Sequence, residues 1–62
     1  MAKFIQLPIS YDNDWIMAPI NIDSIAYIKP TNDNLSRLFF SGGAEIIVNK
    51  NYEELSEFIL SL

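Results

Sequence analysis

Cysteine and histidine are both absent from this chain of 62 residues. Their absence excludes disulfides and also excludes metal sites built from thiolates or imidazoles. It removes the commonest general base and the strongest nucleophile of enzyme active sites as well. We therefore expect a protein that is not an enzyme and that holds no cofactor and no metal.

Positive charge is scarce. The chain has four basic side chains against eight acidic ones, and its net charge is −4. The basic residues are scattered, and none adjoins another in the sequence: Lys3, Lys29, Arg37 and Lys50. Because an acidic protein repels phosphate backbones and anionic lipid surfaces, we expect no nucleic-acid partner and no membrane partner.

Long apolar runs are also missing. No run approaches the roughly 20 residues that a membrane-spanning helix needs. Near the N-terminus, Gln6, Pro8 and Ser10 interrupt the apolar residues, which argues against the core of a signal peptide. The expected location is the cytoplasm.

Hydrophobic residues make up 50% of the chain, which is too apolar for a disordered protein. A chain of this length forms a single domain, residues 1–62, near the lower limit of independent folding. Such small domains commonly need a disulfide, a metal or oligomerisation for stability. With the first two excluded, we expect a homo-oligomer, and a dimer first.

Turn-forming residues divide the chain into short apolar segments, with turns or bends at residues 11–14, 21–24, 30–34 and 42–43. Between them we expect strands at about residues 3–9, 15–19, 25–29, 35–41 and 44–48. Gly42 and Gly43 suit a two-residue hairpin turn, in which both central residues have positive φ. The fold class is α+β: a small antiparallel β-meander of four to five strands followed by one C-terminal α-helix.

The C-terminal segment has the period of a helix, at about residues 52–61. Asn51 suits the N-cap, and Glu54 stands three residues later as in a capping box. Apolar residues then recur on one face of the helix: Tyr52, Leu55, Phe58, Ile59 and Leu62.

The expected sheet is apolar on both sides, although one short helix can cover only one of them. In the fourth strand, Leu38 and Phe40 share one side, while Leu35 and Phe39 share the other. Strong curvature could hide both sides within one chain. Alternatively, a partner covers the second side, as is usual for large exposed apolar patches. We expect Phe40 to face Leu55 and Phe58 of the helix, and Phe39 to be buried only by a partner.

Six residues are candidates for an interface, chosen because Trp, Tyr and Arg are enriched at binding hot spots or because they lie on the second side: Tyr11, Trp15, Leu35, Arg37, Phe39 and Ile47. Trp15 fits a core position equally well. Arg37 could instead pair with Glu45 across the last hairpin.

Other polar groups have simpler interpretations. Glu53, Glu54 and Glu57 suit a solvated helix face. The run Asp12-Asn13-Asp14 lacks the glycine and glutamate of a calcium loop and suits a turn. Gly42-Gly43 lacks the Lys-Ser/Thr of a phosphate-binding loop.

The run Ile46-Ile47-Val48, followed by Asn51-Tyr52-Glu53-Glu54-Leu55, resembles the end of the small FlbD-like flagellar proteins and of similarly built short proteins of bacteria and phages. The resemblance extends over most of the chain, through the bend at residues 21–25 and the glycine turn. It implies the same meander-plus-helix fold, a role in regulation, a bacterial or phage-infected cell, and no catalytic residues.

Two hypotheses for function follow. The first is a small, non-enzymatic, self-associating module that regulates or inhibits another protein by binding it. The second is an oligomeric protein that binds a small nucleotide-like ligand between subunits, with Tyr11, Trp15, Tyr27 and Arg37 stacking on the ligand or pairing with it.

Overall fold

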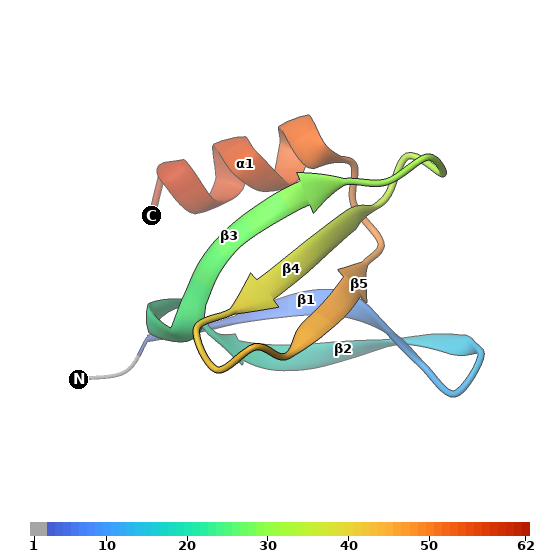
Figure 1. Ribbon diagram of the computed structural model, residues 1–62, viewed down its shortest axis with the longest axis horizontal. Helices are drawn as coiled ribbons and strands as arrows, with labels where there is room; N and C mark the ends of the chain where they lie inside the picture. Colours follow the sequence, from blue (N-terminus) through green and yellow to red (C-terminus); the bar gives the residue numbers. More distant parts are fainter. Residues whose placement is uncertain (1–2) are drawn as a thin grey trace.

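The computed structural model describes residues 3–62 as one five-stranded antiparallel sheet followed by one helix (Figure 1). This arrangement confirms the α+β fold. The strand order in the sheet is β2-β1-β5-β4-β3. The elements are β1 (Phe4–Tyr11), β2 (Asp14–Asn21), the 3-10 helix η1 (Ile22–Ser24), β3 (Ile25–Pro30), β4 (Ser36–Phe40), β5 (Glu45–Val48) and α1 (Tyr52–Leu60).

Strands β1 and β2 form a hairpin that is longer than the sequence predicted. They pair continuously from Phe4 opposite Asn21 to Tyr11 opposite Asp14. The turn is reduced to Asp12 and Asn13, whose φ angles of 51° and 64° are left-handed. Such angles at both central residues define the type I′ turn, which matches the twist of the strands and which Asp and Asn tolerate. Tyr11 and Asp14 therefore belong to the strands and not to the turn.

The β4–β5 turn differs from the expected two-residue hairpin. The Phe40 N–H donates to the Ala44 carbonyl at 2.9 Å, and the Gly43 N–H donates to the Phe40 carbonyl at 2.9 Å. The loop between Phe40 and Ala44 thus has three residues, and of its two glycines only Gly43 has a positive φ, 94°. A tight turn followed by one left-handed residue is the usual three-residue solution.

The two halves of the sheet meet at β1 and β5, where Ile9 pairs with Val48. The Asn49 N–H donates to the Pro8 carbonyl at 2.8 Å. Because Pro8 has no N–H, it cannot donate a hydrogen bond back to β5, and the hydrogen-bonded ladder between β1 and β5 is short. Strands β2 and β3 are opposite edges of the sheet, yet η1 joins them through three residues. Their ends must therefore meet at one corner, which bends the sheet. Figure 1 shows the β1–β2 hairpin running in a different direction from β3, β4 and β5.

A β-bulge in β3 changes which residues face the core. Strict alternation would place Ile25 on the same side as Tyr27. The register instead shifts between these residues, so that Ile25 pairs with Phe40, and Ile28 pairs with Leu38. The extra residue returns both isoleucines to the core side and leaves Tyr27 on the opposite side.

Helix α1 begins as the sequence predicted. The Asn51 side chain accepts a hydrogen bond from the Glu54 N–H at 2.8 Å, which satisfies one of the first-turn donors. The helix lies along β3 (Figure 1).

The core lies between the bent sheet and α1. Its fully buried apolar side chains are few: Leu7, Leu38, Val48 and Leu55, with Ile20 nearly so. Phe40 packs against this cluster, as expected. Phe58 is not part of this packing, and 39% of the residue remains exposed. The helix turns Leu55 and Ile59 toward the core and leaves Phe58 on its flank.

Candidate interaction surfaces

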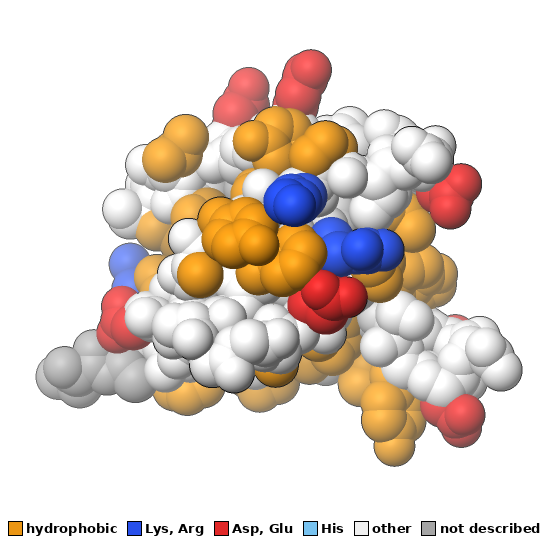
Figure 2. Space-filling view, in the orientation of Figure 1, with side chains coloured by type: hydrophobic (Ala, Val, Ile, Leu, Met, Phe, Trp, Pro, Cys, Tyr) orange, Lys and Arg blue, Asp and Glu red, His pale blue; other side chains and the backbone are white. Residues whose placement is uncertain are grey.

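Six side chains form a regular grid on the side of β3, β4 and β5 that faces away from the core. The first row is Tyr27, Phe39 and Glu45, and the second row is Lys29, Arg37 and Ile47. Residues directly opposite in a sheet share a side, so the two registers place all six together. We call this set the outer face. Figure 2 looks onto it and shows hydrophobic side chains with basic and acidic groups beside them.

The aromatic rings of the outer face cover each other. Tyr27 and Phe39 stack with their centroids 4.6 Å apart and their planes 10° from parallel. Phe39 is therefore half-buried within a single chain. The expectation that only a partner can bury Phe39 is wrong, because the bulge in β3 brings Tyr27 across from it.

The basic residues of the outer face are direct cross-strand neighbours, Lys29 opposite Arg37. The Lys29 ammonium lies 5.7 Å from the Tyr27 ring centroid and 5.6 Å from that of Phe39. These near-equal distances place it beside the stacked pair, at the edges of both rings and not over either face. Arg37 is exposed and lies opposite Ile47. Glu45 lies opposite Phe39, so it is a diagonal neighbour of Arg37 and does not lie directly across from it.

The β1–β2 hairpin differs from the outer face, because its register sets no two aromatic rings opposite each other. Trp15, Ile16 and Met17 are consecutive and expose 41%, 40% and 59% of their surface, and Tyr11 exposes 64%. Consecutive strand residues point to opposite sides. Apolar groups are therefore exposed on both sides of this hairpin. Figure 2 shows hydrophobic atoms protruding where Figure 1 draws it.

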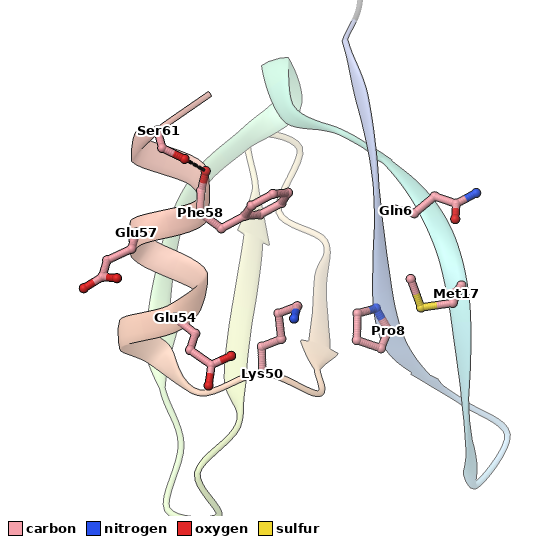
Figure 3. Close-up of a pocket in the computed structure, with 8 residues that line it drawn as sticks. All are labelled: Gln6, Pro8, Met17, Lys50, Glu54, Glu57, Phe58 and Ser61. Atoms are coloured by element: carbon pink, nitrogen blue, oxygen red, sulfur yellow. Dashed lines mark hydrogen bonds between the residues drawn. The ribbon is translucent and has the colours of Figure 1, made fainter.

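An open groove of about 790 Å³ separates the hairpin from the flank of α1 (Figure 3). Phe58 points from the helix toward the hairpin, while Pro8 and Met17 border the opposite wall. Lys50 and Glu54 lie at one end, and Glu57 points away from the groove. The remaining lining residues are Gln6 and Ser61. The groove thus continues the apolar surface of the hairpin, on the side that carries Met17.

The structure divides the six predicted interface residues between two regions. Tyr11 and Trp15 belong to the hairpin, while Arg37, Phe39 and Ile47 belong to the outer face. Leu35 precedes β4 and is half-buried. For the alternative ligand hypothesis, Tyr27 and Arg37 lie together on the outer face, but Tyr11 and Trp15 lie elsewhere.

Three further surface residues were not among the sequence candidates: Ile16, Met17 and Lys29. Ile16 and Met17 belong to a continuous apolar run, which is typical of a buried strand. Such a run has no alternation of polar and apolar residues that would show which side is exposed. Lys29 lies eight positions before Arg37, and only the strand register brings the two together.

Within residues 3–62, no group of three or more acidic side chains is placed so that it could hold a metal ion. In the same range no helix has the length and apolar character required to cross a membrane. No protein-family model, no curated protein and no solved structure matches this chain.

Proposed function

We propose that this protein is a non-enzymatic, self-associating interaction module that regulates or inhibits another protein by binding it. The observation that carries the proposal is the run of three consecutive exposed apolar residues, Trp15, Ile16 and Met17. Large exposed apolar patches in small proteins generally mark interaction sites. Burial of a side chain of this size stabilises by roughly 1.5–3 kcal/mol, so leaving several in water forgoes much of the stability of a small domain.

The backbone of β2 favours association through side chains over the addition of a further strand. Pro19 can lie in this edge strand only where its nitrogen faces away from β1. By the two-residue period of a strand, the N–H groups of Trp15 and Met17 face outward as well. The Asp14 carboxylate already accepts a hydrogen bond from the Trp15 N–H at 2.8 Å. Of these three outward positions, only Met17 still offers a donor to a neighbouring strand, and one donor makes a weak template.

Self-association is tested by sedimentation analysis of the wild type and two matched variants. We expect the wild type to form a dimer in a concentration-dependent manner. Met17→Glu places a charge on the hairpin surface and should yield a folded monomer. Leu60→Glu makes the same kind of change on α1, at a side chain that is even more exposed, and should leave the dimer intact.

The chain has a single tryptophan, Trp15, which reports on the hairpin directly. Its fluorescence should shift to shorter wavelength as the concentration rises in the wild type and in Leu60→Glu, but not in Met17→Glu. A wild type that stays monomeric at high concentration would remove the basis of the proposal. So would a Met17→Glu variant with an unchanged assembly state.

A further inference from the structure

A hollow at one end of the outer face has an unusual electrostatic character for this protein. It is open to solvent, has a volume of about 230 Å³ and is lined by Lys29, Pro30, Thr31, Asn32 and Arg37. Two of the four basic residues of the chain thus line one hollow, and none of its eight carboxylates does. The whole molecule has a net charge of −4, whereas the charged groups that line this hollow are both positive.

The pairing of Lys29 with Arg37 is unfavourable within the folded chain. Like charges directly opposite each other in a sheet destabilise the pair of strands. The Lys29 ammonium lies toward the aromatic rings, and Arg37 has no directly opposite carboxylate. An anion between the two groups would convert this repulsion into two attractions.

The polar groups of the β3–β4 loop complete a set of hydrogen-bond donors. The Thr31 Oγ1 atom accepts hydrogen bonds from the N–H groups of Asp33 and Leu35, both at 3.2 Å. With its acceptor sites used in this way, the hydroxyl proton is free to be donated. The side-chain amide of Asn32 can donate as well.

We propose that this hollow binds the phosphate group of a small phosphate monoester whose aromatic or apolar body lies against Tyr27. Two basic groups without a lining carboxylate match a group with a charge of about −2 better than a carboxylate, which carries −1. The planar guanidinium of Arg37 can hold two phosphate oxygens at once, and Lys29 supplies the second positive charge.

Tyr27 is suited to hold the body of the ligand. Phe39 covers one face of its ring, at 4.6 Å, and half of the Tyr27 side chain is still exposed. A second hollow adjoins it along the edge of β3 and includes Ala26, Tyr27 and Ile28. Tyr27 borders this apolar hollow and lies two residues before Lys29 on the same side of the sheet, so an aromatic group held against Tyr27 would lie on the same face as the phosphate hollow. This inference does not depend on self-association through the hairpin.

The test is an NMR titration of the full chain with phenyl phosphate, inorganic phosphate and benzoate as probes. We expect saturable shifts of the backbone amides of Lys29, Thr31, Asn32 and Arg37, with phenyl phosphate binding about tenfold more tightly than benzoate. Inorganic phosphate should shift the same amides, bind more weakly than phenyl phosphate and leave the ring protons of Tyr27 unmoved.

Two variants and one control assign the binding to the hollow. Arg37→Gln and Lys29→Gln should each weaken phenyl phosphate binding about tenfold, the loss expected for one charge-assisted hydrogen bond. Lys3→Gln removes the same charge from an exposed residue outside the hollow and should change the affinity less than about twofold. Binding should be unchanged in Met17→Glu.

Three results would overturn the inference. The first is the absence of saturable shifts in the wild type with phenyl phosphate. The second is an equal loss of affinity in Lys29→Gln and Lys3→Gln, which would indicate attraction by overall charge alone. The third is benzoate binding as tightly as phenyl phosphate, which would show that the hollow does not select a doubly charged group.

Discussion

The outer face and the β1–β2 hairpin pose the same structural problem and solve it differently. Both are strands with apolar side chains on the side away from the core. On the outer face the chain covers its own rings, because a bulge brings Tyr27 against Phe39. On the hairpin, Trp15 and Met17 lie opposite Ser10 and Pro8, and both remain partly exposed. An apolar second side therefore does not require a partner in itself. Cover from within the chain depends on the local register, which sets two rings opposite each other on the outer face and at no position of the hairpin.

The largest expected effect separates the core side of β4 from its outer side. Leu38 is fully buried, while the adjacent Phe39 is half-buried beneath Tyr27. Leu38→Ala should lower the free energy of unfolding by about 2–5 kcal/mol, through lost burial and a residual cavity. Phe39→Ala should cost clearly less, since much of its surface is already in water. Urea denaturation followed by circular dichroism measures both. Equal losses would show that the outer ring is part of the core.

A second experiment weakens the hairpin without touching its apolar surface. Asn13 has a φ of 64°, in the left-handed region. Asn13→Val places a β-branched residue there and should cost about 1–2 kcal/mol, while Asn13→Gly should be tolerated. Denaturation of both variants gives the values. If Asn13→Val has the same free energy of unfolding as the wild type, the type I′ turn does not form. The positions of the exposed apolar residues on β2 would then be wrong as well.

The strands and the helix could be predicted from the sequence, whereas the pairing between strands could be predicted only in part. Turn residues and periods located all five strands and the helix, and Asn51 caps the helix as expected. The pairing of β1 with β5 could not be predicted, because it depends on a contact between residues far apart in the chain, Ile9 and Val48. The bulge at Ala26 was also missed, since a local pattern of alternation cannot show an inserted residue.

The same limit applies to the candidate surfaces. Tyr11 and Trp15 were recognisable as an aromatic pair next to a polar turn, and both are exposed. The grouping of Lys29 with Arg37 depends on the register of β3 and β4, which the sequence alone left undetermined. The sequence can therefore identify single residues as candidates for a site. Which of them lie together can be determined only from the fold.

A third experiment measures how much the outer face satisfies itself. A double-mutant cycle with Tyr27→Ala and Phe39→Ala should give a coupling of about 0.5–1.5 kcal/mol, as expected for a stacked aromatic pair. A matched cycle between Tyr27→Ala and Trp15→Ala joins the two regions and should give coupling near zero, since neither residue contacts the other. Equal coupling in the two cycles would contradict the contrast between the outer face and the hairpin.

The smallest expected effect is a gain in stability. Lys29→Glu replaces the repulsion with Arg37 by an opposite-charge cross-strand pair and should stabilise the fold by roughly 0.2–1 kcal/mol. Lys3→Glu changes the net charge equally, at an exposed residue before β1, and should not stabilise. Thermal unfolding of both variants at low ionic strength measures the difference, and added salt should reduce it.

Lys29→Glu should also abolish the binding of phenyl phosphate. Stabilisation together with loss of binding is expected when a residue serves a ligand at the expense of the fold. A Lys29→Glu variant that is less stable than Lys3→Glu would show that Lys29 supports the sheet, and the like-charge argument for a ligand would fail.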